Sequence, residues 1–368
     1  MNIVLRKTCI RLCISGLMIL TGTMVFAQFS ESREFVKRFK IQPETRIDLT
    51  NKYGKIELNT WKKDSVVIRF KMEINAKKPI KPEQKLDNLD FDMSNSQHYL
   101  IVKTQVDKNR SQIESELLKF KETILQTGGS IKIDLDVWLP DNHELRLENK
   151  FGDIIMDDYH GETQIILSNG KLRAGELTRH AQLNLSFADA TVENLPTARI
   201  TSNYSDIELR NSGSVQFDSK SSTIEILNSE ELNIDSRRDK FRIRIANKLN
   251  ASGNFSQFRV SELKDKANVK LNYGGLEMEK IDDAFTNIYL EARSADINLY
   301  FSPEAKFNYE ITEAKTDLKL GRELKEEENE VLDSKENKIR HSGYFGKKMK
   351  DDQLIINAVG GETNVLAY

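Results

Sequence analysis

Cysteine is nearly absent from this sequence: its 368 residues include two, Cys9 and Cys13, and both lie before residue 28. The same stretch has a basic start, an apolar run and small residues up to Ala27, which is typical of a secretory signal peptide. The run is short and diluted by serine, glycine and threonine, which favours a cleaved signal over a membrane anchor. We therefore expect residues 1–27 to be a signal peptide, and the mature chain to lack disulfides, thiolate metal sites and cysteine nucleophiles.

An excess of charge of either sign is also missing. Lysine and arginine number 55 and aspartate and glutamate 57, and removing Arg6, Lys7 and Arg11 with the signal leaves 52 against 57. A nucleic-acid partner requires a concentrated basic face, so this even distribution argues against one. No apolar run after the signal is long enough for a transmembrane segment. We expect an exported protein in the periplasm or at the cell surface.

Motifs for chemistry are missing as well. The sequence has no G-x-S-x-G elbow, no P-loop, no H-E-x-x-H pair and no G-G-x-G-x-D calcium repeat. We predict no catalytic, cofactor-binding or metal-binding residues and no cofactor. Zinc sites need clustered ligands, whereas the histidines are dispersed and are expected to be scattered over the surface; they are His98, His143, His160, His180 and His341.

What the chain does contain is a repeat. Gly152 anchors one copy, with apolar residues seven and five positions before it and two, four and seven positions after it. The template recurs in steps of 17 or 18 residues, with a looser copy at Ala295 and a solitary upstream copy at Gly54. The intermediate anchors are Gly170, Ala188, Ser205, Ser222, Asp239, Ser256 and Gly274.

This repeat predicts an all-β fold. Apolar and polar residues alternate within each copy, as in half-buried strands, and no helix-period segments separate the copies. A fixed period below 20 residues indicates a β-solenoid of about 17–18 residues per turn. About five buried apolar side chains contribute near 10 kcal/mol per turn, whereas ordering some 17 residues costs about 1–2 kcal/mol each. No turn is therefore stable alone, and stability requires stacking.

The expected organisation follows the repeat. Residues 28–44 form a lead-in with a short strand at best, and 45–368 form the solenoid domain with its repeat array at 144–300. Residues 62–140 form an α+β excursion with strands at 66–74, 99–102 and 131–140, a basic proline-containing loop within 76–97, and a helix at 109–127. The helix has its apolar stripe at Ile113, Leu117, Phe120 and Ile124. Packing against the strands is its expected role, and partner binding is the alternative.

The C-terminal part is expected to cap the array. Residues 305–368 contain a strand near 307–311 and a final apolar stretch at 354–366 that predicts a last turn. Between them, residues 321–341 are dominated by charge and are interpreted as a mobile loop or short helix. An uncapped solenoid exposes unpaired strand edges, so the excursion and this tail are the candidate caps.

Three surface features invite a functional interpretation. Basic residues from Arg237 to Arg244 surround Asp239, which predicts a solvated outer corner, with an anion-binding patch as the alternative. Acids such as Asp153, Asp157, Asp158, Asp189, Asp206 and Asp296 could in principle pair for glycoside hydrolysis. Aromatic residues precede several anchors and are expected to be half-buried over the core edge; an exposed, sugar-binding ladder is the alternative. They are Tyr53, Phe151, Phe187, Tyr204 and Tyr273.

Two segments also carry a family resemblance. Asn51-Lys52-Tyr53-Gly54-Lys55-Ile56-Glu57-Leu58 and Glu148-Asn149-Lys150-Phe151-Gly152-Asp153-Ile154 resemble the opening motifs of a bacterial family of exported β-repeat proteins, frequent in Bacteroidota. That family is labelled "putative adhesin" and is similar to the head GIN domain group. The resemblance covers roughly residues 45–75 and 130–368. It implies a right-handed parallel β-helix, and the handedness of parallel crossovers favours the same hand.

These observations lead to one expected function and one alternative. The expected function is a non-catalytic, adhesin-like interaction or scaffold protein of the cell envelope, with an envelope protein or a glycan as partner. Its oligomeric state is left open. The alternative is a carbohydrate-active β-helix enzyme, a polysaccharide lyase or hydrolase, which would need a loop-walled acidic groove.

Overall fold

The computed structural model describes residues 29–76, 91–104, 129–350 and 352–368. Within these ranges the chain is all-β, with 21 strands in one long, mostly parallel sheet. They contain no helix, and so none that could cross a membrane. The predicted signal peptide, the helix at 109–127 and most of the basic loop at 76–97 lie outside the described residues.

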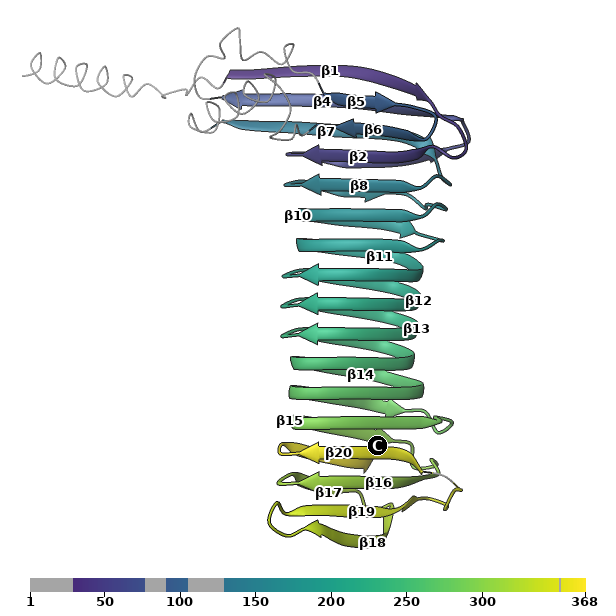
Figure 1. Cartoon of the computed structure of the whole chain (residues 1–368), viewed down its shortest axis with the longest axis vertical. Coiled ribbons are helices and arrows are strands. Elements are labelled where there is room, and N and C mark those ends of the chain that lie inside the picture. The colour runs from purple at the N-terminus through teal and green to yellow at the C-terminus, as the bar shows by residue number, and fades with distance from the viewer. Residues whose placement is uncertain (1–28, 77–90, 105–128, 351) are drawn as a thin grey trace, which may run out of the picture.

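The strands form one elongated stack that begins with β1 and ends with β18, and from β8 to β15 the stack follows chain order (Figure 1). They are β1 (Phe29–Lys40), β2 (Arg46–Lys52), β3 (Ile56–Trp61), β4 (Ser65–Ala76), β5 (Asp92–Asn95), β6 (Tyr99–Lys103), β7 (Ser130–Pro140), β8 (Leu145–Lys150), β9 (Ile154–Met156), β10 (Thr163–Glu176), β11 (Ala181–Asn203), β12 (Asp206–Lys220), β13 (Thr223–Arg237), β14 (Lys240–Ile281), β15 (Asn287–Phe301), β16 (Phe307–Ala314), β17 (Asp317–Leu320), β18 (Leu324–Asp333), β19 (Lys338–Phe345), β20 (Asp352–Val359) and β21 (Glu362–Ala367).

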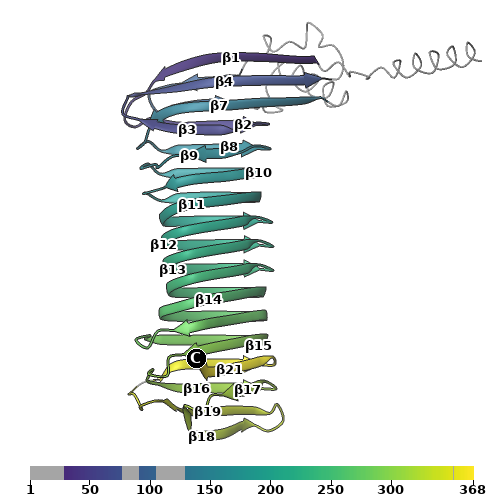
Figure 2. The same cartoon turned by 180° about the vertical axis from the view of Figure 1, so that it is seen from behind.

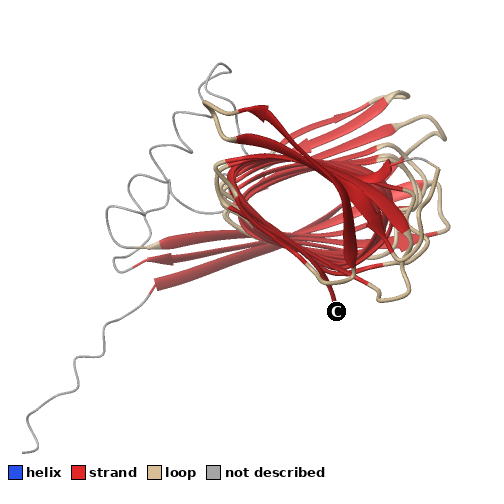
Figure 3. Cartoon of the chain, turned by 90° about the horizontal axis from the view of Figure 1, so that it is seen from below, coloured by secondary structure: helices blue, strands red, loops and turns tan. Residues whose placement is uncertain are grey.

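Each circuit of the chain, which we call a rung, pairs in parallel with the next. Ile165 lies beside Leu183 and Ile207 beside Ile224, so the register steps by 18 or 17 residues, as the repeat predicts. Seen along the long axis, the strands wrap around an oval outline (Figure 3). The sheet is therefore built from one repeating unit along most of its length.

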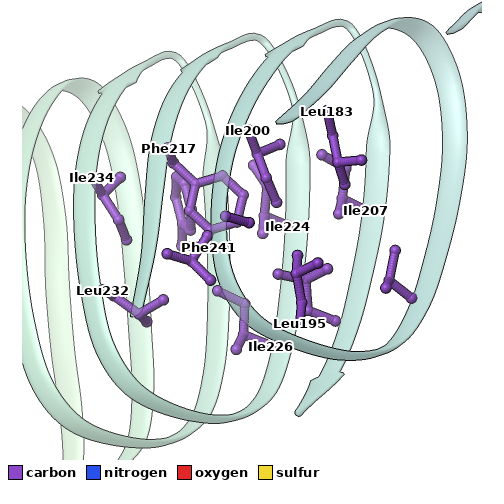
Figure 4. Packing of buried hydrophobic residues seen from close by; sticks show 14 of the residues in the cluster. Leu183, Leu195, Ile200, Ile207, Phe217, Ile224, Ile226, Leu232, Ile234 and Phe241 are labelled. Carbon is purple, nitrogen blue, oxygen red and sulfur yellow. The ribbon is translucent and has the colours of Figure 1, made fainter. Parts of the chain in front are cut away.

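The interior is filled by the apolar residues of the alternating pattern. Their side chains form rows from rung to rung, such as Ile200–Phe217–Ile234 and Ile207–Ile224–Phe241 (Figure 4). All six are buried, and each contributes about 1.5–3 kcal/mol by leaving water. The predicted core positions are thus confirmed.

A sharp corner stands at every anchor. The residue before the anchor has a positive φ in each rung, from 66° at Tyr53 to 48° at Ser294. The backbones then approach closely: a Cβ on Gly152 would lie 1.9 Å from the carbonyl oxygen of Gly54. This approach explains why the anchors are mostly small.

The solitary copy at Gly54 stacks directly on the copy at Gly152. Ile47 pairs with Leu145 in β2–β8 and Ile56 with Ile154 in β3–β9, which joins segments 98 residues apart in sequence. On the other side of this rung lie β6 and β7, which pair in parallel with β2 and β3. Strands β6 and β7, which lie between the two copies in sequence, therefore cover the first rung (Figure 2).

Beyond β7 the N-terminal end changes to antiparallel pairing. β4 pairs with β7, and β1 pairs with β4 along its full length. The lead-in was expected to hold a short strand at best; β1 is instead a strand of 12 residues. Apolar and polar residues alternate along β1, and this pattern favours a strand. Phe35 stacks on Phe70 at 4.6 Å, so β1 extends the core over the end of the stack.

The C-terminal end departs from chain order. The rung formed by β20 and β21 lies between β15 and the rung of β16 and β17, pairing with both in parallel. The predicted last turn therefore stacks on β15 at the end of the array, and β16 to β19 lie beyond it. The interpretation of residues 321–341 as a loop or short helix is wrong, because β18 and β19 form an antiparallel hairpin on β16. The charged residues of this hairpin form ion pairs across its two strands, such as Arg340–Glu330.

Candidate functional site

A row of aromatic side chains follows the corner before the anchors. We call this row the aromatic corner; it comprises Tyr53, Phe151, Phe187, Tyr204, Phe255 and Tyr273. The rings stack in three nearly parallel pairs, with centroid distances of 5.5, 5.1 and 4.8 Å in chain order. Tyr53 is half-buried, and the other five are 51–59% exposed. The expectation of half-buried rings over the core edge is therefore wrong for Phe151, Phe187, Tyr204 and Tyr273, and Phe255 was not part of it.

The backbone explains the exposure. A residue with positive φ sits at the corner, between the strands that line two sides of the oval, and its side chain points away from the interior. For a residue other than glycine this conformation costs about 1–2 kcal/mol, and bulky residues adopt it rarely. Rungs without an aromatic residue place Asn169, Ser221, Arg238 or Ser294 there. Stacking of two rings contributes about 0.5–1.5 kcal/mol, which is less than the backbone cost of placing two residues in this conformation. Local energetics alone therefore do not favour aromatic residues at the corner.

The three pairs are separated by rungs that have no aromatic residue at the corner. Asn169 alone lies between Phe151 and Phe187, whereas Ser221 and Arg238 lie between Tyr204 and Phe255. With strands spaced about 4.8 Å apart, these intervals are about 10 and 14 Å. The corner therefore presents apolar ring faces at intervals along the axis, with polar side chains between them.

A hollow of about 330 Å³ lies on the rungs that carry Phe255 and Tyr273, and its lining includes Gln257 and Gly275, the second residue after each of them. It forms because Gly275 places no side chain in the row of outward residues that follows the anchors. Gly275 is the second residue after the corner residue Tyr273, so the hollow adjoins the aromatic corner. Its rim is polar and comprises Lys240, Arg242, Gln257, Arg259, Glu277, Asp296 and Asn298.

Most charges at the rim are paired. Arg242 contacts Glu225 at 2.6 Å, and Arg259 contacts Glu279 at 2.7 Å. Glu277 and Glu279 raise the pKa of the Arg259 guanidinium. Among the described residues Lys240 has no ion pair, so its ammonium group and the side-chain amides of Gln257 and Asn298 are donors left for a ligand.

The acids noted in the sequence serve the stack or face water. The carboxylates of Asp153, Asp158 and Asp296 accept backbone N–H groups of the neighbouring rung at 2.8–3.0 Å. Asp189 pairs with Lys171 at 3.4 Å. Asp157 and Asp206 are exposed. These carboxylates therefore bridge rungs or lie at the surface, and the hollow is not walled by long loops.

Asp239 was expected to lie at a solvated outer corner, but its side chain is buried. It is 1% exposed, and its carboxylate accepts hydrogen bonds from the hydroxyls of Ser219 and Ser236 and from the backbone N–H groups of Ser222 and Arg237, at 2.7–2.9 Å. Four donors satisfy the buried charge. The surrounding basic side chains are exposed and remain the solvated part of this rung.

The histidines are dispersed, but one is not at the surface. His143 is 7% exposed, and its Nδ1 lies 2.9 Å from the carbonyl oxygen of Thr45. The carbonyl of His143 in turn accepts a hydrogen bond from the hydroxyl of Tyr159 at 2.8 Å. Among the described residues no group of histidine, cysteine, aspartate or glutamate is arranged to hold a metal ion.

Phe255 is the residue of the aromatic corner that the sequence interpretation missed. It directly precedes the anchor Ser256, so the repeat register was the signal that could have identified it. The hollow left no such signal, because Gly275 follows the anchor Gly274 and resembles part of a glycine turn.

No family model matches the chain, and no curated protein matches it. Two solved structures are similar to it. One is a "putative cell adhesion protein" from Clostridium sporogenes ATCC 15579, with 10% identity, a TM-score of 0.20, and coverage of 92% of this chain and 100% of that one. The other is a "putative adhesin" from Bacteroides fragilis NCTC 9343, with 10% identity, a TM-score of 0.25, and coverage of 90% and 97%. Scores this low support no argument about fold or function.

Proposed function

We propose that this chain is a non-catalytic, adhesin-like protein of the bacterial envelope that binds a polysaccharide along its aromatic corner. One observation carries the proposal: six aromatic residues occupy strained, positive-φ positions, five of them exposed, and stack in pairs along one edge. Strained residues that local energetics do not favour are a reason to look for function at their site.

A polysaccharide fits the chemistry of this corner. Sugar rings combine apolar C–H faces with hydroxyl groups, so they match exposed ring faces with hydrogen-bonding groups beside them. Phe255 and Tyr273 supply the rings, and Lys240, Gln257 and Asn298 supply donors and acceptors at the hollow. The repeated pairs favour an extended polymer over a single sugar, because several weak contacts on one chain raise the apparent affinity.

The finer fold and location belong to the same proposal. The chain is a right-handed parallel β-helix of the adhesin-labelled, head GIN-like family, exported to the periplasm or the cell surface. The parallel register of 17 or 18 residues supports the β-helix. The signal-like first 27 residues and the lack of cysteine after them support export.

The enzyme alternative has less support. Glycoside hydrolysis needs two carboxyl groups with different environments flanking the scissile bond. At the hollow, Glu277 is held by Arg259 at 3.2 Å, and Asp296 accepts the backbone N–H of Glu362 at 3.0 Å. Both carboxylates thus have structural partners, and this favours binding without turnover.

Co-sedimentation with insoluble polysaccharides tests the proposal. Peptidoglycan sacculi, chitin and cellulose serve as probes, and the bound fraction is measured against polymer concentration. We expect the protein to pellet with at least one probe. The double variant Phe255→Ala/Tyr273→Ala should weaken binding by about tenfold or more, equivalent to about 1.4 kcal/mol. Gly275→Gln should weaken it too, because a side chain there fills the hollow and displaces only the Gln257 side chain.

Tyr99→Ala is the matched control, since Tyr99 is an exposed aromatic residue on β6, away from the corner. It should bind as the unmodified protein does. Equal binding by the corner variants and the control, or no pelleting with any probe, would contradict the proposal. Release of soluble sugars from a probe would favour the enzyme instead.

A further inference from the structure

Two strands leave a free edge at opposite ends of the stack. Among the described residues β1 pairs only with β4, and β18 pairs only with β19. They lie at the two ends of the long axis (Figures 1 and 2). With 12 and 10 residues they are long for edge strands, and neither contains proline. Such edges expose backbone N–H and C=O groups that can pair with another chain.

β18 is unusual in its exposure. All of its residues except Leu324 are exposed, including Val331 at 61% and Leu332 at 43%. A strand that buries almost nothing gains little from the hydrophobic effect. β18 therefore presents an extended edge that is ready for pairing and that, beyond β19, has no partner among the described residues.

The two free edges carry opposite charge. The part of β1 that lies over the first rung is Phe35–Lys40, in register through β4 and β7 with β3. It contains Lys37, Arg38 and Lys40 and no acidic residue. β18 carries five acids and a single lysine, Lys325; the acids are Glu326, Glu327, Glu328, Glu330 and Asp333.

Part of the acidic charge is balanced within the cap, and part is not. Glu326, Glu327 and Glu330 pair with His341, Lys348 and Arg340, all on or near β19. Glu328 has no ion pair among the described residues. On β1, Arg38 and Lys40 likewise form no ion pair within the described part of the chain. Both edges therefore retain charge for a partner.

We infer that copies of this chain assemble end to end, with β1 of one copy adding as a strand to the β18 edge of the next. Like ends repel each other, and unlike ends attract, so the contact is head-to-tail. A head-to-tail contact between different surfaces does not close on itself unless the rotation forms a ring, and it produces filaments. The partner of each end is thus a second copy of the same chain.

The geometry allows the strands to match. β1 continues the side of the oval that holds β3, and β18 continues the side that holds β2 and β16 (Figures 1 and 2). A second copy turned by about half a turn around the long axis brings the two edges together. The chain runs in opposite directions on the two sides, so β1 and β18 would then run parallel, as most of the stack does.

Charge reversal with complementation tests this inference. Arg38→Glu/Lys40→Glu makes both ends acidic. Glu327→Lys/Glu328→Lys/Glu330→Lys leaves Glu326 and Asp333 against four lysines on β18, and so makes the β18 end basic like β1. Sedimentation velocity should show the unmodified protein in species that grow with concentration beyond a dimer. The growth should diminish between roughly 0.05 and 0.5 M salt, as the Debye length shortens. Each variant alone should stay monomeric, and an equimolar mixture should assemble again.

The mixture also controls for folding, because a misfolded variant could not restore assembly. A monomer at every concentration would mean that the charges and irregular register of β18 protect the edge, and would overturn the inference. So would variants that assemble alone as the unmodified protein does, or a mixture that stays monomeric while both variants keep the β-type circular dichroism of the unmodified protein.

Discussion

The side-chain amide of Asn149 donates a hydrogen bond of 2.8 Å to the carbonyl oxygen of Gly54, which lies 95 residues earlier in the chain. Asn51 repeats the contact one rung up, donating to the carbonyl oxygen of Ile133 at 2.9 Å. Both asparagines are fully buried. They join the first rung to the array on one side and to its cover on the other, so the stack remains continuous where the sequence is interrupted.

Asn149→Ala should destabilise the protein. The Asn149 amide also donates to the carbonyl of Asp153 at 2.9 Å, so the change removes hydrogen bonds to two carbonyl oxygens. The expected loss is about 1–3 kcal/mol, measured as a lower melting temperature. Ser202→Ala is the control at the equivalent repeat position, because the Ser202 hydroxyl has no hydrogen-bond partner among the described residues. An equal effect of both changes would contradict the role given to Asn149.

Leu276→Asp should unfold or truncate the array. Leu276 is 1% exposed and pairs with Ile297 in the next rung. Truncation of a buried leucine costs about 2–5 kcal/mol, and an unpaired buried carboxylate adds to that cost. Asn272→Asp places the same group on an exposed position of the same strand and should melt like the unmodified protein. Near-equal melting of the two variants would show that the register is wrong.

Two buried tyrosines should respond differently to loss of their hydroxyls. Tyr159 donates to the carbonyl of His143 at 2.8 Å, whereas the hydroxyl of Tyr309 has no partner among the described residues. Tyr159→Phe should therefore cost about 0.5–1.5 kcal/mol at neutral pH, and Tyr309→Phe close to nothing. The reverse order of melting temperatures would contradict these environments.

Alkaline pH gives a second test of Tyr309. Burial, with Glu326 and Glu327 nearby, raises the pKa of its hydroxyl to about 12, from 10.0. Above pH 10 the unfolded chain loses this proton while the folded chain keeps it, so stability falls by about 1.4 kcal/mol per pH unit up to pH 12. Between roughly pH 8 and pH 11 the unmodified protein should therefore lose about 1.4 kcal/mol more of its free energy of unfolding than the Tyr309→Phe variant loses. Equal losses of stability in the two proteins would contradict a buried, neutral Tyr309 hydroxyl.

Arg238→Gly should stabilise the protein. Arg238 is exposed and has a φ of 59°, which costs about 1–2 kcal/mol for a residue with a Cβ and nothing for glycine. We expect a gain of about 1 kcal/mol in the free energy of unfolding. Asp218→Gly, on an exposed position inside β12, should lose about 0.5–1 kcal/mol instead. A loss at both positions would argue against strain at the corner.

Repetition made the core predictable. One template, read at Gly152 and shifted by 17 or 18 residues, placed Leu276, Ile207 and Phe241 inside, because side chains must alternate along every rung. It also matched the copy at Gly54 to its distant partner. What repeats along the chain could thus be read from the sequence.

The misplaced residues depend on features that the hydrophobic template does not specify. The direction of the rings at the corner follows from a positive φ, which the aromatic residue type disfavours. Asp239 is buried because Ser219 and Ser236 of two successive rungs donate to it, and these hydroxyls meet only after stacking. The place of β20 between β15 and β16 is set by pairing across the cap, for which sequence order gives no sign.

Engineered disulfide formation between Glu57→Cys and Ile155→Cys tests the continuous stack most directly, in a chain with Cys9 and Cys13 replaced by serine. These residues pair in parallel across β3 and β9, and side-by-side strands place Cα atoms within the 4.4–6.8 Å that a disulfide spans. Glu57→Cys with Arg173→Cys, two rungs apart at roughly 10 Å, is the control. The account predicts rapid, complete oxidation of the first pair and none within the second. Absence of the bond between residues 57 and 155 would contradict it.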